Sequence, residues 1–293
     1  MSCSARLPVY ILFIGAFFPG NPTLVLIGLY FTGIVLAVIT AHLFNKTLFK
    51  SKEAPFVMEL PPYRLPTVKS IIKHMWDKSA QYLQKVGGVI LIAVIIIWAL
   101  GYFPQKVKYS TNFDAEINNI EQQLQYPDQA SQQPLLIEKL NQLRIQKKRE
   151  HLEKSWLGQI GHFIEPAIRP LGFDWRVGIA LMSGTAAKEV VVSTIGVILQ
   201  SEEGNGTDEG KLVLRLREMK HDHGPSVGKT VFTPVTALAF LLFVLIYFPC
   251  IGVVSAIAKE SGRWRWAFFI IGYTTALAWL VAFFVNQIGS NLF

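Results

Sequence analysis

The sequence predicts an all-α, polytopic membrane protein, built as a helical bundle in which some helices are interrupted or re-entrant. Two observations carry this prediction. Hydrophobic residues make up 51% of the 293 residues, and charged residues only 16%. The charged residues also gather in four stretches, 45–85, 104–154, 200–232 and 259–265, with long apolar runs between them. A soluble domain spreads charge over its surface and a disordered chain lacks apolar runs, so both classes are excluded.

Four of the apolar runs are long enough to cross a membrane as a helix, because about 20 residues span a hydrocarbon core of about 30 Å. They are 23–44, 86–103, 233–258 and 266–288. A fifth run, 177–199, has the length but contains the charged pair Lys188-Glu189. The run 7–18 is too short to span, and predicts a half-helix or the remainder of a longer helix.

Together, the apolar runs and the charged stretches divide the chain into seven segments. They are a short helix with a membrane helix (1–44), a cytoplasmic segment with an amphipathic helix (45–85), a membrane helix (86–103), an extracytoplasmic helical loop (104–154), an interfacial helix with an interrupted helix (155–199), a flexible loop (200–232) and the last membrane helices (233–293). Within 67–85, apolar residues recur at helical spacing opposite lysines, so this helix lies on the lipid interface or packs on the bundle. Within 104–154, the spacing of leucine and isoleucine predicts two antiparallel helices broken near Pro127.

The side of the membrane that each segment faces follows from its Lys and Arg content. Stretch 45–85 holds eight Lys or Arg residues against three acidic residues, which places it in the cytoplasm. Simple alternation then places 104–154 outside, 200–232 inside and 259–265 outside. The last assignment conflicts with three basic residues that favour the inside, Lys259, Arg263 and Arg265. We therefore expect one of the interrupted runs to enter the membrane and return to the side from which it came.

A helix break is predicted in the middle of the run 233–258. Pro249 removes an amide donor and clashes with the preceding turn, and Gly252 weakens the helix further, which frees backbone carbonyls near Phe248. Cys250 lies beside this break, where a thiolate is able to ligate a soft or borderline cation. The alternative is that Cys250 is a small hydrophobic residue and that Pro249 only kinks the helix.

A second interruption is predicted in the run 177–199, where Ser183 and Gly184 precede Lys188 and Glu189. A charged side chain at membrane depth costs about 3 kcal/mol on insertion scales, which favours a functional role. Adjacent helical residues diverge by about 100°, so we expect one of the two charges to face a polar path and the other to bond elsewhere. The alternative is small-residue helix packing with Lys188 reaching the interface.

Three further observations concern metal and nucleotide binding. Cys3 opens the first apolar run, where a helix start favours the thiolate, and its distance along the chain from Cys250 gives no support for a disulfide framework. His162 and Glu165 share a helix face, but two ligands do not make a metal site, and a solvated interfacial face is the simpler interpretation. The segment 224–230 resembles a phosphate-binding loop but has one residue too few between its glycines.

Several short motifs, taken in order, resemble the later part of the membrane domain of ferrous iron transport protein B (FeoB). They are Ser2-Cys3-Ser4-Ala5-Arg6-Leu7-Pro8-Val9-Tyr10 with Ala16-Phe17-Phe18-Pro19, Met58-Glu59-Leu60-Pro61-Pro62-Tyr63-Arg64-Leu65-Pro66, Glu165-Pro166 with Pro170-Leu171-Gly172 and Asp174-Trp175-Arg176, Ala187-Lys188-Glu189-Val190-Val191-Val192-Ser193-Thr194, and Tyr247-Phe248-Pro249-Cys250. Members of this family begin with a cytoplasmic GTP-binding domain, a helical spacer and earlier spans. The resemblance therefore implies that the chain is a truncated or split product.

The resemblance implies a multi-pass transporter for Fe²⁺ in the bacterial inner membrane, with one cysteine in each of two gate regions. Cys3 matches the first gate and Cys250 the second. The residues implied to line the Fe²⁺ path are Cys3, Cys250, Glu189 and Ser183, and the gate residues beside them are Arg6, Pro8, Pro249, Gly252, Lys188 and Gly184. We expect the two cysteines to meet across the bundle and replace the hydration shell of Fe²⁺, with the Glu189 carboxylate assisting electrostatically.

The same resemblance sets the expected cofactors and partners. Fe²⁺ is the transported substrate, no cofactor is expected to stay bound, and the chain is not expected to be an enzyme. GTP would act only through a domain that this chain does not contain. The expected partners are membrane lipid, a GTPase and spacer half, small accessory Feo proteins and a further copy of the chain. Nucleic acid is not expected, because the net charge of +8 is spread over several loops without a single basic face.

Two alternatives to an iron permease stay open at this point. One is a non-transporting membrane scaffold that needs a separate GTPase half. The other is a nucleoside-type transporter, because the gate regions also look similar to those of nucleoside-recognition membrane domains.

Overall fold

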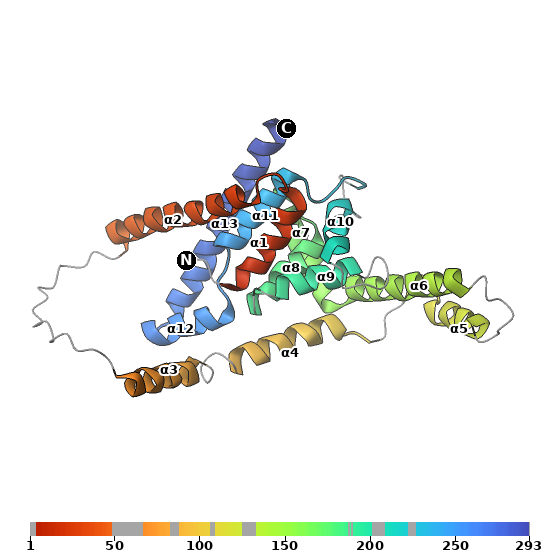
Figure 1. Cartoon of the computed structure of the whole chain (residues 1–293), viewed down its shortest axis with the longest axis horizontal. Helices are drawn as coiled ribbons and strands as arrows, with labels where there is room; N and C mark the ends of the chain where they lie inside the picture. The colour runs from red at the N-terminus through yellow and green to blue at the C-terminus, as the bar shows by residue number, and fades with distance from the viewer. Residues whose placement is uncertain are drawn as a thin grey trace, which may run out of the picture.

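The structure, a computed structural model, describes residues 4–48, 67–82, 88–105, 109–124, 133–186, 188, 190–200, 209–221 and 227–292 (Figure 1). Within these ranges the regular elements are helices, apart from one antiparallel bridge between Lys220 and Thr230. Three helical spans in this part of the chain are long and apolar enough to cross a membrane, namely Pro22–Thr47, Pro234–Ser261 and Trp264–Ser290. The predicted all-α membrane bundle is confirmed.

In chain order the elements are η1 (Ser4–Arg6), α1 (Leu7–Phe17), α2 (Pro22–Thr47), α3 (Val68–Tyr82), α4 (Gly88–Tyr102), α5 (Phe113–Leu124), α6 (Gln133–Lys154), α7 (Trp156–Ile168), η4 (Arg169–Leu171), α8 (Trp175–Ala186), α9 (Val190–Gln200), α10 (Glu209–Glu218), α11 (Pro234–Ile246), α12 (Ile251–Ser261) and α13 (Trp264–Leu292).

The core of the bundle is formed by α1, α8, α9, α11 and one side of α13 (Figure 1). Phe240 on α11 lies at its centre, with ring centroids 4.5 Å from Phe13 on α1 and 5.6 Å from Phe173 before α8. All three rings are completely shielded from the surroundings. Since lipid is as apolar as these side chains, close packing and ring contacts hold the helices together more than exclusion from water does.

Polar side chains set the starts of the helices that build this core. Thr233 and Thr236 form a reciprocal capping box at the start of α11. Asp174 caps α8, because its carboxylate accepts a hydrogen bond of 3.1 Å from the backbone N–H of Val177. The same carboxylate accepts a bond of 2.7 Å from the guanidinium of buried Arg176. Each cap satisfies backbone donors that a helix start leaves without a partner.

Helices α8 and α9 form a re-entrant hairpin. They have 12 and 11 residues and pack against each other. At 1.5 Å per residue they are about 18 and about 16.5 Å long, which is too short to cross about 30 Å of hydrocarbon. Val177 at the start of α8 and Leu199 at the end of α9 line one small cavity, so the hairpin begins and ends at the same end of the bundle. This geometry is the one expected of an interrupted run that returns to the side from which it came, and the side of the membrane stays a prediction.

This hairpin resolves the charge conflict and corrects two of the assignments made by alternation. Phe44 at the end of α2 packs its ring on Phe269 and Tyr273 near the start of α13, with centroids 5.7 and 4.8 Å apart. Stretch 45–85 therefore begins at the same end of the bundle as 259–265, as the basic residues of 259–265 favour and simple alternation does not. The described part of 200–232 lies at the other end, beside Phe18. Alternation fails because it counts α8 and α9 as one crossing.

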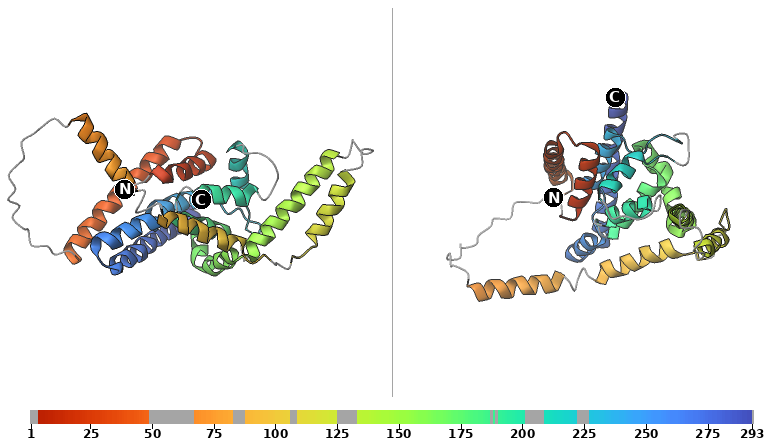
Figure 2. Two further views of the ribbon diagram at one scale, coloured as in Figure 1. Left: turned by 90° about the horizontal axis from the view of Figure 1, so that it is seen from below. Right: turned by 45° about the vertical axis from the view of Figure 1, so that its right-hand side comes forward.

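The peripheral helices differ from the core. α5 and α6 pack on each other through four buried side chains, Phe113, Ile120, Leu140 and Leu143, and project from the bundle as a pair (Figures 1 and 2). The predicted break near Pro127 lies outside the described residues. α3 exposes its apolar residues, including Trp76 and Ile72, so of the two alternatives for this helix, packing on the bundle is not observed in the described part of the chain.

The stretch expected to be a flexible loop, 200–232, contains a helix in its described part. Leu216 on α10 and Met219 after it are buried in the core of the bundle. The guanidinium of Arg217 donates a hydrogen bond to the carbonyl of Ala16 at the end of α1. Leu212, Val213 and Leu216 recur at helical spacing, which predicts a helix here. The prediction of a flexible loop relied on the glycines of the stretch instead.

Candidate functional site

The two predicted helix interruptions meet inside the bundle. Lys188 lies between α8 and α9, and Tyr247 ends α11. The Lys188 ammonium lies 3.8 Å from the centroid of the Tyr247 ring and 3.5 Å from the Tyr247 carbonyl oxygen. Both residues are buried, with 3% and 4% of their surface exposed. These two contacts join residues that are 59 positions apart in sequence.

The break between α11 and α12 follows from Pro249. Proline has no N–H for the carbonyl one turn earlier, and it disfavours helical backbone at Phe248. α11 accordingly ends at Ile246, and α12 begins after Cys250, whose carbonyl accepts hydrogen bonds of 2.9 and 3.2 Å from Val253 and Val254. At this break the carbonyl of Tyr247 accepts a hydrogen bond of 3.5 Å from the Lys188 ammonium.

Gly184 makes room for the Tyr247 side chain. A Cβ atom at this position would lie 2.6 Å from the Tyr247 hydroxyl oxygen and 2.3 Å from Cγ2 of Val191. The hydroxyl itself donates a hydrogen bond of 3.5 Å to the carbonyl of Leu181. Ser183 beside it is 1% exposed. The small residues in the run 177–199 thus serve close packing around a tyrosine that holds the hairpin against α11.

The predicted first gate lies near the second. Pro8 occupies the first turn of α1, where a missing N–H costs nothing. Arg6, at the end of η1, is 9% exposed and its Nε atom has no hydrogen-bond partner. It lines a cavity of about 720 Å³ together with Leu245 and Ile246 at the end of α11. The start of α1 therefore approaches the end of α11 just before the break.

The described ionisable groups at this meeting point are Arg6, Lys188 and the thiol of Cys250, which is partly buried and free. Cys3 and Glu189 lie outside the described residues, so the meeting of Cys3 with Cys250 stays a prediction. Gly252 is buried in the first turn of α12. Within the described part of the chain, no three metal-binding side chains come together.

His162 lies between two carboxylates on the side of the bundle. Its Nδ1 atom is 3.2 Å from Glu165, as the spacing predicts, and its Nε2 atom is 3.9 Å from Glu153. The two ring nitrogens point away from each other, so the carboxylates do not converge with the imidazole on one point. The ring also stacks on Trp175, with centroids 4.8 Å apart. This geometry favours a structural pairing over a metal site.

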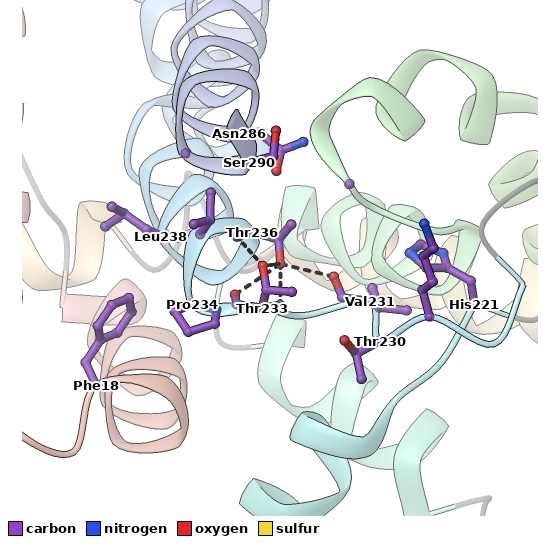
Figure 3. Close-up of a pocket in the computed structure, with 14 residues that line it drawn as sticks. Phe18, His221, Thr230, Val231, Thr233, Pro234, Thr236, Leu238, Asn286 and Ser290 are labelled. Atoms are coloured by element: carbon purple, nitrogen blue, oxygen red, sulfur yellow. Dashed lines mark hydrogen bonds between the residues drawn. The ribbon is translucent and has the colours of Figure 1, made fainter. Parts of the chain in front are cut away.

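A cavity of about 810 Å³ lies at the start of α11 (Figure 3). Its lining combines apolar side chains such as Phe18 and Leu238 with hydroxyls and the amide of Asn286, and it includes no carboxylate among the described residues. His221 lines it from the segment before α11, and burial lowers the pKa of this histidine, although Asp174 opposes the effect. A neutral imidazole beside Lys229 and hydroxyls gives a hard cation no anionic ligand. The cavity is therefore a poor cation site.

Sequence reasoning did not single out Tyr247 as a site residue. It appeared only within the motif Tyr247-Phe248-Pro249-Cys250. The available signal was an aromatic residue directly before a helix break, in a chain that also carries a lysine at membrane depth. Aromatic rings bind cations at their faces, so the pair was a foreseeable contact.

Comparison with known proteins identifies two families along the chain. The family "Ferrous iron transport protein B C terminus" matches residues 26–78, and the Gate family, described as "Nucleoside recognition", matches residues 83–264. No solved structure matches the chain.

Curated relatives align over nearly the whole chain. A protein of Porphyromonas gingivalis named "Fe(2+) transport protein A/Fe(2+) transporter FeoB fusion protein" is 48% identical over 100% of this chain and 34% of its own length. Proteins named "Fe(2+) transporter FeoB" are 36% identical in Campylobacter jejuni, over 97% of this chain and 39% of that protein, and 32% identical in Helicobacter pylori, over 98% and 43%. The chain thus spans well under half the length of these relatives. The chain belongs to the FeoB family, of which it carries the Gate and C-terminal membrane regions.

Proposed function

We propose that this chain forms the membrane path by which Fe²⁺ crosses a bacterial inner membrane, as the permease part of a FeoB-type transporter. Its relatives are named Fe(2+) transporters. The observation that carries the proposal is the meeting of the two helix interruptions at Lys188 and Tyr247, three residues before Cys250. Non-helical backbone inside a membrane is tolerated where it is buried in protein or lines a cavity, and such breaks are where transporters bind their ions.

The chemistry of this region suits a cation that must be bound and released. Backbone carbonyls replace the water ligands of an ion, and a cysteine thiolate adds a softer ligand that favours Fe²⁺ over Mg²⁺ or Ca²⁺. Cys250 is the residue directly before α12, so its side chain lies beside the helix break. In the proposal Cys3 and Glu189 complete the path, and Ser183 lines it.

The proposal extends to cofactors and partners. Fe²⁺ is a passing substrate, and no resident cofactor takes part. The chain itself performs no hydrolysis, and GTP acts through another domain or polypeptide. The Porphyromonas relative, whose name joins transport protein A to FeoB, supports a small accessory Feo protein as a partner. A GTPase and spacer half, membrane lipid and a second copy of the chain complete the proposed assembly.

Flux measurements on a Cys250 variant test the proposal. The chain is reconstituted in liposomes under anaerobic conditions, alone and with a co-expressed GTPase half, and Fe²⁺ entry is followed with an entrapped chelating dye. We expect Cys250→Ser to reduce Fe²⁺ entry at least about tenfold, because the hydroxyl is a harder and weaker ligand than the thiolate. Ser255→Ala on the same helix is the matched control and should leave entry unchanged.

The outcomes separate the competing functions. Wild-type flux in Cys250→Ser would remove the ligand role. No flux from the wild-type chain, even with the GTPase half, would favour the scaffold. Inhibition of flux by nucleosides would favour the nucleoside-type transporter, which the names of the relatives do not support.

A further inference from the structure

We infer that the groove between α2 and the pair α11 and α13 binds an anionic phospholipid, whose phosphate group pairs with the buried guanidinium of Arg6. The lipid comes from the leaflet that lies on the side of stretch 45–85. The inference does not depend on the proposed function, because a lipid site of this kind exists whether or not the chain conducts Fe²⁺.

The guanidinium of Arg6 is a buried charge that makes no hydrogen bond through its Nε atom in the described part of the chain. The residue is 9% exposed. Arginine stays charged in proteins and offers five N–H donors in a planar fork. A buried charge is costly unless it is paired and hydrogen-bonded, and inside a membrane such a residue almost always has a partner or contacts water. Arg6 therefore needs an acceptor that the described residues do not provide.

The groove that Arg6 lines lies between helices that face lipid. Its volume is about 720 Å³. The α2 residues that line it lie between positions 30 and 41, a length of about 17 Å at 1.5 Å per residue. Only 6% of the apolar window of α2 and 11% of that of α13 are buried. Lipid therefore reaches the groove from the side, and the apolar walls suit an acyl chain.

The lining of the groove selects an anion. Among the described lining residues Arg6 is charged, and the others are apolar or carry a hydroxyl. The hydroxyls of Thr40 and Thr274 donate to carbonyls of their own helices, at 3.1 and 2.7 Å. The guanidinium is therefore the main hydrogen-bond donor that the groove offers to a ligand. Its fork matches the oxygens of a phosphate group, which accept two parallel N–H bonds.

The depth of Arg6 indicates which leaflet supplies the lipid. Arg6 shares the groove with Leu245 and Ile246, the last residues of α11. Because α11 has 13 residues, they lie about 20 Å from the end of the bundle at which this helix begins. In a hydrocarbon core of about 30 Å, this depth falls in the half nearer to 45–85. Local thinning of the bilayer brings headgroups to arginines at such depths.

Exposed basic residues surround the same end of the bundle. Lys46 lies in the last turn of α2, and Arg263 and Arg265 lie at the start of α13. Such residues attract anionic lipid, and basic pockets between membrane helices on the cytoplasmic side bind anionic headgroups. A zwitterionic phospholipid has the same phosphate and chains but no net charge. We therefore expect the anionic lipid to be preferred.

Lipid binding to the purified chain tests the inference without iron transport. The chain is delipidated in detergent and titrated with phosphatidylglycerol or phosphatidylcholine, and bound lipid is counted by native mass spectrometry. We expect the wild type to retain one phosphatidylglycerol in preference to phosphatidylcholine. Arg6→Met should bind it at least about tenfold more weakly, because charge-assisted hydrogen bonds are lost. Arg265→Met removes the same charge from an exposed position at the same end, and this matched control should keep the lipid.

A stability measurement keeps the test decisive if one variant folds poorly. Phosphatidylglycerol should raise the melting temperature of the wild type, since a ligand that binds the folded chain stabilises it, and should leave that of Arg6→Met unchanged. Ala37→Phe narrows the groove without a change of charge, and should abolish both the bound lipid and the shift in melting temperature. Val35→Phe adds the same ring to α2 at a position that does not line the groove, and should behave as the wild type.

Other occupants of the groove give different results. Equal retention of phosphatidylglycerol by the wild type, Arg6→Met and Ala37→Phe would overturn the inference. Stabilisation by inorganic phosphate that depends on Arg6, without any preference for phosphatidylglycerol, would assign the site to a free anion and overturn the lipid. A dimer without bound lipid that dissociates in Arg6→Met would mean that a second copy of the chain covers the groove, which would also overturn it.

Discussion

Helix α2 and the interrupted helix α11–α12 are both apolar enough to cross a membrane, yet they are placed in opposite ways. Only 6% of the apolar window in α2 is buried within the bundle, against 61% in the span Pro234–Ser261. α2 exposes large side chains along its length, among them Leu24, Ile27, Phe31, Ile34 and Val38. Apolar composition therefore identifies a membrane helix but does not tell whether lipid or protein surrounds it.

The difference between the two helices is that one of them is interrupted. α11 ends at Ile246, directly before a break that contains Tyr247 and Pro249, whereas α2 continues unbroken for 26 residues. A broken helix needs partners for its freed backbone groups, and in a membrane only other parts of the protein supply them. Burial of α11 is thus the condition under which its break is stable, and α2 has no such requirement.

Truncation of one phenylalanine in each helix should give the largest contrast. Phe240→Ala removes a ring at the centre of the core, and we expect a loss of about 3–5 kcal/mol in the free energy of unfolding. Phe31→Ala on α2 removes a ring that is 66% exposed, and we expect less than about 0.5 kcal/mol, as for surface substitutions. Denaturant unfolding in detergent micelles measures both. Equal losses would show that α2 is packed against protein as tightly as α11.

An added methyl group should give a smaller contrast in the same direction. Gly184→Ala places a Cβ atom against Val191 and the Tyr247 hydroxyl, and we expect a destabilisation of about 1–3 kcal/mol from overpacking. Gly28→Ala on α2 is the matched control, because nothing lies within 4 Å of its Cβ position. This control should be neutral or gain up to about 1 kcal/mol from the better helix propensity of alanine. Thermal melts measure whether each variant loses or gains stability. An unchanged melting temperature in Gly184→Ala would mean that the Tyr247 hydroxyl does not pack over Gly184 as described.

The apolar helices and their interruptions could be predicted from the sequence, but the contacts between distant residues could not. The apolar runs, the break at Pro249 and the interruption at Lys188 are local properties, because proline chemistry and charge act within one turn. The contact between Lys188 and Tyr247 joins residues that local rules treat separately, so Tyr247 was missed. The placement of Arg6 near Leu245 depends in the same way on how helices pack.

The errors have physical causes of their own. Simple alternation assigned 200–232 and 259–265 to the wrong ends of the bundle relative to 45–85. The reason is that the hairpin α8–α9 has enough residues for one membrane span but returns to the end from which it started. The glycine-rich sequence of 200–232 obscured the helical spacing of Leu212, Val213 and Leu216 in α10. Cys3 and Glu189 lie outside the described residues, so the roles given to them stay predictions.

The measurement that tests the re-entrant gate most directly is the sidedness of three single cysteines. In a chain without Cys3 and Cys250, Lys46→Cys, Lys259→Cys and Val227→Cys place a thiol at exposed positions in the last turn of α2, near the end of α12 and before α11. We expect an impermeant maleimide to label positions 46 and 259 from one face of oriented vesicles, and position 227 from the other. Labelling of 46 and 259 from opposite faces would mean that α8–α9 crosses the membrane, and would contradict the account.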